Sequence, residues 1–278
     1  MSRLMQTAII KKDITGITGN KRLLSILCIV PLIMSVVLPM IFIFAIQMAP
    51  PEQTGNIVRL VNDARTGIPS VNESLNQNFA GAIPEQFRLT AIRFILNYIM
   101  PLFFLLIPIM SSSVMAASAF VGEKEKNTLE TLLYCPLPLK EIFGAKILAS
   151  FLLSMAISVA SFIVMLVVLE TVLIIISGTA VMPGLSWLII MLLVSPSLAL
   201  LAINLIVRGS AKSASIEESQ QRAVFLVLPV VLLIVGQFTG VMLLSVWLLF
   251  AIGAVLAIIA VFMFKGSFSK FQYETLLL

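Results

Sequence analysis

The chain has 278 residues, of which 60% are hydrophobic and 11% are charged, and its net charge is +5. A single soluble domain of this length cannot bury so much apolar surface, so the composition predicts an integral membrane protein with several spans. The absence of histidine excludes a Ser-His triad, a His-ligated zinc ion and a haem-binding histidine. Cys28 and Cys135 form no metal-binding or disulfide pattern, and Asp13 and Asp63 lie outside the apolar runs. We therefore expect no catalysis by this chain alone and no metal site.

Apolar runs long enough to cross a bilayer, which takes about 20 residues, follow one another along the chain. The last uncharged stretch, 223–264, is twice the length of a span and predicts a hairpin that turns within 238–245. We predict one all-α transmembrane domain over 1–278 with an N-terminal interfacial helix, an outer loop over 50–93, a cytoplasmic coupling segment over 122–146 and a second cytoplasmic loop over 208–222. The six predicted spans are 23–48, 94–121, 147–169, 187–207, 223–240 and 244–264.

Lysine and arginine indicate the orientation. Only four of the eighteen, Arg59, Arg65, Arg88 and Arg93, lie in the predicted outer loop, and the other fourteen lie at the termini or in the segments 122–146 and 208–222. By the positive-inside rule, both termini are expected in the cytoplasm. This asymmetry accounts for the basic charge without a nucleic-acid partner.

The predicted spans contain almost no ionisable group, although ion-coupled carriers normally carry them there. Their polar candidates are Gln47, Asn97, Asn204, Gln237 and Glu170 at the margin of a span, and each is read as a residue of helix contacts or interfaces. Prolines within the spans predict kinks. The energy for any transport is therefore expected to come from outside the spans.

A short helix is predicted between spans two and three. Asn127 and Glu130 form a capping-box arrangement, and Pro136 ends the helix. Three leucines, Leu129, Leu132 and Leu133, share one face. Such a helix either lies on lipid headgroups or docks a cytoplasmic protein, and its mixed charges favour the protein partner.

Three stretches resemble one family. The sequence G-E-K-E-K-N-T-L-E-T-L-L-Y-C-P-L, from Gly122, resembles the segment after the second span in permease subunits of type-two ABC exporters, whose pattern is G-E-x-E-x-x-T-L-E-x-L-L-x-x-P. The residues 9–14 and 20–22 resemble the N-terminal interfacial helix of that family, with Asp13 where glutamate is usual and with Gly16 and Gly19 predicting a short or broken helix. The loop 210–221 resembles the pattern S-x-x-x-K-S-x-x-E-A-x-Q. The layout is similar to sodium-efflux and multidrug or peptide-efflux permeases, although the outer loop is short for a sodium-efflux member.

The resemblance implies a permease subunit that exports a substrate across the cytoplasmic membrane of a prokaryote. It implies two permease copies, identical or different, with two ATP-binding cassette ATPase subunits. No G-x-x-x-x-G-K-[ST] motif occurs, so no cofactor is expected on this chain, and ATP and magnesium are expected on the partner. The implied coupling residues are Glu123, Glu125, Thr128, Leu129, Glu130, Leu132 and Leu133, and a secondary cytoplasmic contact is implied for Ser213, Glu217 and Gln220.

Three other functions compete with this one. A non-transporting membrane scaffold or assembly factor would also dock a cytoplasmic partner. An ion-coupled carrier is disfavoured by the lack of acids within the spans, and a membrane enzyme by the lack of histidine and of intramembrane aspartate.

Overall fold

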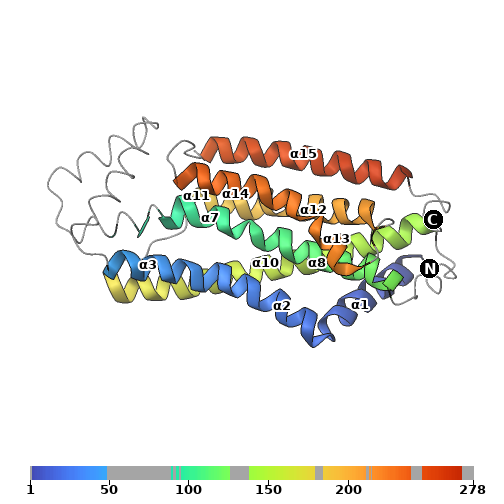
Figure 1. Cartoon of the computed structure of the whole chain (residues 1–278), viewed down its shortest axis with the longest axis horizontal. Helices are drawn as coiled ribbons and strands as arrows, with labels where there is room; N and C mark the ends of the chain where they lie inside the picture. The colour runs from blue at the N-terminus through green and yellow to red at the C-terminus, as the bar shows by residue number, and fades with distance from the viewer. Residues whose placement is uncertain are drawn as a thin grey trace.

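The computed structural model describes residues 2–48, 89, 92–93, 95–125, 138–178, 184–210, 213, 215–238 and 246–270. Within these residues all regular structure is helical, which confirms the all-α prediction (Figure 1). The elements are α1 (Ser2–Thr18), α2 (Lys21–Leu32), η1 (Ile33–Val37), α3 (Leu38–Met48), η2 (Ile95–Ile99), α7 (Met100–Phe104), α8 (Leu106–Glu125), α10 (Leu139–Ser177), α11 (Leu185–Ile189), η3 (Ile190–Val194), α12 (Ser195–Gly209), α13 (Ile216–Gln221), α14 (Val224–Phe238) and α15 (Val246–Lys270).

Among the described residues, six helical stretches are long and apolar enough to cross a membrane, as predicted. They are Leu23–Met48, Ile95–Glu125, Lys140–Ile176, Leu185–Gly209, Ile216–Gly236 and Val246–Lys265. The third is longer than the predicted span because the helix α10 continues beyond the charged residues Lys146 and Glu170 that bound the apolar run. It ends only where Gly178 takes a left-handed φ of 64° and donates its N–H to the Ile174 carbonyl. The predicted hairpin turn between α14 and α15 falls largely outside the described residues.

The helices form an elongated bundle (Figure 1). The helix α1 lies at one end of it, together with the last turns of α8 and α15 and the first turns of α10, and we call this end the α1 end. The short helix α13 packs on α8 at the same end. The charged segments that the sequence separates therefore meet in one region.

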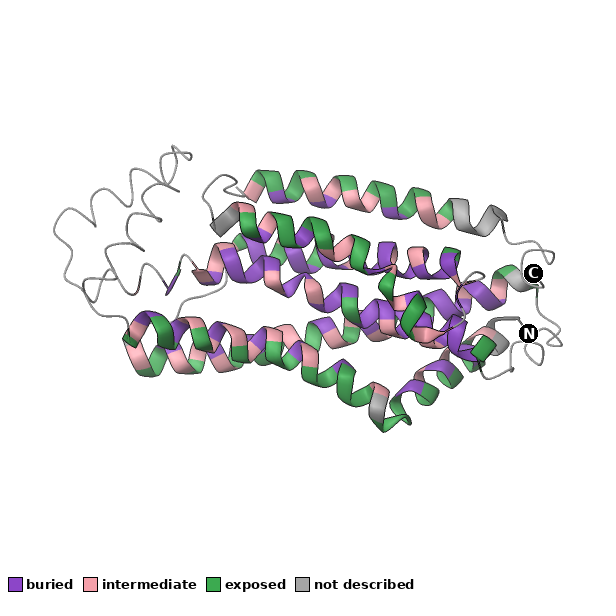
Figure 2. Ribbon diagram, in the orientation of Figure 1, coloured by how far each residue is buried: buried purple, intermediate pink, exposed green. Residues whose placement is uncertain are grey.

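Two spans form the centre of the bundle. In the most apolar windows of the second and fourth spans, 78% and 67% of residues are buried, whereas 17–28% are buried in the other four (Figure 2). The helix α12 packs against α8, α10 and α15. Large apolar side chains on the outer helices, such as Phe225 (77% exposed) and Phe262 (78%), face outward, as expected where lipid surrounds the protein.

In the part of the chain that the structure describes, three π-helical segments occur, and each ends two residues before a proline. They precede Pro39, Pro101 and Pro196. Proline has no N–H to donate, and its ring clashes with the carbonyl four residues earlier, which in each case lies in the middle of the π segment. The wider turn relieves that clash, so these prolines widen the spans locally while the helices continue.

The N-terminal helix is longer than its glycines predict. The helix α1 continues through Gly16 to Thr18, so the expectation of a short helix is wrong, whereas a break does occur at Gly19, before α2. It ends at Gly19, after which the Asn20 side chain accepts a hydrogen bond from the Leu23 N–H at 3.4 Å and the chain enters α2. The packing described below holds α1 together despite the low helix propensity of Gly16.

Candidate functional site

A buried ion cluster joins three helices at the α1 end. Its members are Lys12 and Asp13 on α1, Glu123 in the last turn of α8 and Lys146 in the third turn of α10. We call these four residues the ion cluster. They come from three parts of the sequence, so the cluster exists only in the folded chain.

The helical period places Asp13 in the cluster. Ile9, Asp13 and Ile17 are spaced four residues apart and form one buried face of α1. Ile9 packs with Ile142 and Ala145 of α10, so this face is directed toward the start of α10. An acid in the middle of an apolar face must be buried when the helix docks, and it then requires a positive partner.

Lys146 is that partner and the centre of the cluster. Its ammonium nitrogen lies 2.9 Å from Glu123 Oε2 and 3.6 Å from Asp13 Oδ2, and only 2% of its side chain is exposed. It also donates a hydrogen bond to the Ala119 carbonyl at 2.8 Å and lies 5.8 Å from the centre of the Phe120 ring. Lys146 therefore links α10 to both α8 and α1.

Lys12 completes the cluster from the surface. Its ammonium is 3.0 Å from Glu123 Oε1, but 60% of its side chain is exposed. The two acids and two bases balance in formal charge, which is what a buried group of charges needs. The outer pair contributes little by itself, because exposed ion pairs are worth about 0–1 kcal/mol.

Burial controls the protonation of Asp13. Removal from water raises the pKa of the Asp13 carboxyl, and the nearby Glu123 carboxylate raises it further, while Lys146 and Lys12 lower it. The net effect is a raised pKa. A cleft of about 280 Å³ borders the cluster and is lined by residues of α1, α2 and α8, among them Asp13 and Glu123, and by Asn20 in the turn between α1 and α2. This cleft is large enough for water to reach the acids.

The coupling segment predicted from the sequence begins at this cluster. Glu123, one of its predicted residues, is buried among Lys146 and Lys12, whereas Glu125 is exposed at the end of α8. The remaining predicted residues, Thr128, Leu129, Glu130, Leu132 and Leu133, lie outside the described residues. The segment connects the end of α8 to the start of α10 at Leu139, and the ion cluster joins these two helices to each other.

The second predicted contact lies beside the end of α8, where the coupling segment begins. Ser213 is buried and donates a hydrogen bond to the Gly209 carbonyl at 3.1 Å. Glu217 is exposed and Gln220 half-buried on α13, which Ser215 caps by accepting a hydrogen bond from the Glu218 N–H at 3.2 Å. The helix α13 packs on α8, where a β-carbon at Gly122 would lie 3.4 Å from Ile216. The end of α8, where the coupling segment begins, is therefore a neighbour of α13.

Sequence reasoning did not identify Lys146 or Asp13 as members of a site. Each is a charged residue at a position where the helical period predicts an apolar one: Asp13 lies between Ile9 and Ile17, and Lys146 lies between Ile142 and Ile147. That pattern indicates a buried charge but gives no partner.

Two polar residues of the spans, Asn97 and Asn204, have structural roles. Asn97 accepts a hydrogen bond from the Gly184 N–H at 2.7 Å and so joins the second and fourth spans, as predicted. Asn204 is fully buried and donates to the Leu200 carbonyl at 2.8 Å. In the described part of the chain, no group of three acids, cysteines or histidines is placed to hold a metal ion.

Comparison with known proteins gives one finding. A family model described as ABC-2 family transporter protein matches residues 7–256, which includes α10, the ion cluster and almost all of the bundle. No curated protein and no solved structure shows a significant match.

Proposed function

Because the chain belongs to the ABC-2 family of transporter proteins, whose members form the membrane part of ABC transporters, we propose that it exports a substrate with the energy of ATP hydrolysed by a separate subunit. The family implies an ABC ATPase partner for this multi-pass permease. We propose two permease chains, identical or different, and two ATPase chains in the cytoplasmic membrane of a prokaryote. ATP and magnesium belong to the ATPase in this proposal.

The proposed orientation places the α1 end in the cytoplasm. The described basic residues Lys124, Lys140, Lys146, Arg208 and Arg222 lie in the segments between spans that meet there, whereas Arg93 precedes the second span at the opposite end. The positive-inside rule then assigns the α1 end to the cytoplasm. An ATPase would meet the permease at this end.

The ion cluster is the observation that carries the proposed coupling. The segment 126–137 leaves α8 three residues after Glu123 and enters α10 seven residues before Lys146. Since Lys146 joins Glu123 and Asp13, a displacement of this segment moves α8, α10 and α1 together. In this proposal, closure of the ATPase dimer displaces the segment 126–137, and the displacement passes to the second span through α8 and to the third span through α10. Alternating access requires such a coupling between the ATP site and the substrate path.

The secondary contact fits the same scheme. The helix α13 exposes Glu217 next to the last turns of α8, so one ATPase surface can touch both segments. The exposed Glu125 lies on the same end of the bundle. A scaffold that docks a partner but transports nothing would share this surface, so only a transport measurement separates the two functions.

The experiment begins with copurification. The tagged chain is extracted from its native membrane in mild detergent, and we expect an ABC ATPase in the purified complex at a native mass of two chains of each kind. The double variant Glu130→Lys with Leu132→Asp should lose the ATPase. A matched charge reversal in the predicted outer loop, Glu73→Lys, should retain it.

Reconstitution in vesicles then tests transport. We expect ATP-dependent accumulation of a substrate on the side opposite to the ATPase, and the double variant should abolish it. The proposal is wrong if the wild-type chain purifies with no ATPase, or if the double variant keeps full ATP-dependent transport. A complex that binds the ATPase but transports none of a broad set of amphipathic substrates would favour the scaffold.

A further inference from the structure

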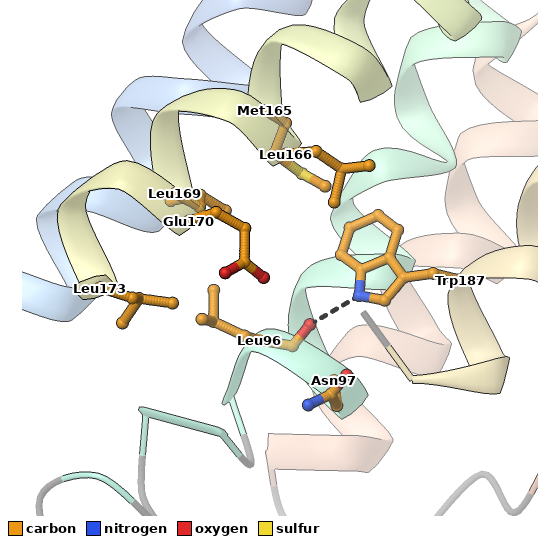
Figure 3. A pocket seen from close by; sticks show the side chains of 8 residues that line it. All are labelled: Leu96, Asn97, Met165, Leu166, Leu169, Glu170, Leu173 and Trp187. Carbon is orange, nitrogen blue, oxygen red and sulfur yellow. Dashed lines mark hydrogen bonds between the residues drawn. The ribbon is translucent and has the colours of Figure 1, made fainter. Parts of the chain in front are cut away.

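A small pocket, drawn in Figure 3, is lined by residues at the end of the bundle opposite to α1 (Figure 1). It is formed where the end of α10 faces the beginnings of the second and fourth spans. Its walls are mainly apolar, with one acid, one amide and one indole among them. The lining residues are Leu96, Asn97, Met165, Leu166, Leu169, Glu170, Leu173 and Trp187.

The indole wall of the pocket is held in place from two sides. The Trp187 Nε1–H donates a hydrogen bond to the Leu96 carbonyl at 3.0 Å (Figure 3). Behind it, the rings of Phe104 and Phe162 each lie 5.6 Å from the Trp187 ring, and 5.9 Å from each other. Because Trp187 is only 3% exposed, packing fixes its ring, and the part that lines the pocket forms a rigid aromatic wall.

Glu170 supplies the charge of the pocket. It lies within the third candidate span and is half-buried, and its carboxylate is directed into the space between Leu96, Leu173 and Trp187 (Figure 3). An ionisable side chain among apolar walls in a membrane-spanning helix is costly and usually serves a function. A carboxylate beside an indole is the combination that attracts organic cations, by charge and by the cation–π interaction.

The size of the pocket limits what it holds. Its volume of about 20 Å³ accommodates roughly one group of the size of water. Pockets that enclose a whole drug-sized ligand are larger by an order of magnitude or more. An ammonium head therefore fits, while the remainder of such a molecule must lie outside, along the apolar helices or the acyl chains.

The donor set favours an organic ammonium over a metal ion. The Leu96 carbonyl already accepts from Trp187, and the Asn97 side-chain oxygen accepts from the Gly184 N–H. Hard metal cations are held by about six or more oxygens, which the apolar walls do not provide. We propose that this pocket binds the ammonium head of an amphipathic amine, with Glu170 as its counter-ion and Trp187 as its aromatic wall. This inference rests on the proposed function, because it names the class of substrate that the permease would carry.

Binding is measured without the ATPase. The chain has two tryptophans, and Trp247 is 81% exposed on α15, so Trp247→Phe leaves Trp187 as the reporter. This variant, in phosphatidylcholine nanodiscs, is titrated with n-octylammonium chloride. We expect a saturable change in fluorescence, and Glu170→Gln should raise the half-saturating concentration at least about tenfold, as expected for loss of a charged hydrogen-bond partner.

Matched controls separate the pocket from the lipid. Octyl sulfate and octanol have the same chain without the positive head and should produce no saturable change. Glu218→Gln removes an equal charge from α13 at the other end and should leave the titration unchanged. Leu166→Phe keeps the charge but reduces the space, and it should weaken octylammonium at least about fivefold, which provides a second variant if Glu170→Gln unfolds.

The pocket proposal is overturned if Glu170→Gln and Leu166→Phe, both folded, bind octylammonium like the parent. It is also overturned if octanol saturates at the same concentration, or if octylammonium produces no saturable change. A negative result of this kind leaves the permease proposal intact, because that proposal is tested by copurification and ATP-dependent transport.

Discussion

Replacement of Lys146 by methionine tests the ion cluster most directly. The substitution keeps an apolar chain of similar length but removes the ammonium that lies 2.9 Å from Glu123 and 3.6 Å from Asp13. Two carboxylates then remain close together at a site where each is about nine-tenths buried. Lys12 still pairs with Glu123, but as an exposed residue it compensates for about 1 kcal/mol or less.

The expected loss in the free energy of unfolding is about 3–5 kcal/mol, the range for removal of one partner from a buried ion pair. Part of it should disappear in acid. Without Lys146 the pKa of Asp13, already raised by burial, rises further, so a proton can neutralise the carboxyl in the folded protein. The loss should therefore be smaller at pH 5 than at pH 8.

The assay is reversible unfolding in mixed micelles by titration with dodecyl sulfate. Lys140→Met is the matched control, because Lys140 is exposed on the same helix, and it should change stability by about 0.5 kcal/mol or less. The triple variant Asp13→Asn, Glu123→Gln and Lys146→Met removes the charges together and should recover most of the loss. The reasoning is refuted if Lys146→Met matches Lys140→Met, or if the triple variant is no more stable than the single one.

Three further predictions concern single residues. The pKa of the Asp13 carboxyl is raised from its ordinary value of 3.8, so this group holds more proton in the folded than in the unfolded chain, and its contribution to stability falls as pH rises from 3.8 through the folded pKa. Asp13→Asn should remove this contribution and flatten the slope of stability against pH in unfolding measured from pH 4 to 8. Gly253→Ala would place a β-carbon 2.8 Å from a Leu193 methyl, whereas the β-carbon of the control Gly122→Ala would lie 3.4 Å from its nearest neighbour. Gly253→Ala should therefore be about 1–3 kcal/mol less stable than Gly122→Ala in the dodecyl sulfate titration. Equal stability of the two variants would contradict the close approach of α15 to η3. Trp187→Phe should cost about 1 kcal/mol through loss of its hydrogen bond to the Leu96 carbonyl, and a thermal unfolding curve that matches the wild type would show that this bond contributes nothing.

The spans could be predicted from the sequence because each depends only on the hydropathy of its own consecutive residues. A run of about 20 apolar residues has one stable arrangement in a bilayer, with every backbone group bonded inside the helix. The same reasoning predicted the role of Asn97 as a contact between helices, although its partner at Gly184 came from the structure. The length of α1 could not be predicted in this way, because the packing of Ile9 and Ile17 outweighs the helix propensity of Gly16.

The candidate site was predictable only in part. The sequence placed Glu123 in a segment of interest, yet Lys146 lies 23 residues away and Asp13 lies 110 residues away. Such pairs depend on the directions in which three helices present their side chains, and no local pattern contains this information. The pocket at Glu170 is a similar case, because its walls come from three separate spans.

The sequence by itself predicted six membrane spans and placed almost all of the charges outside them. Hydropathy and charge count fix both features without reference to neighbours. The tertiary structure decided which charges are internal. It buries Lys146 between two acids and leaves Glu125 and Glu217 exposed, because helix packing determines which face of each helix meets another helix and which meets water.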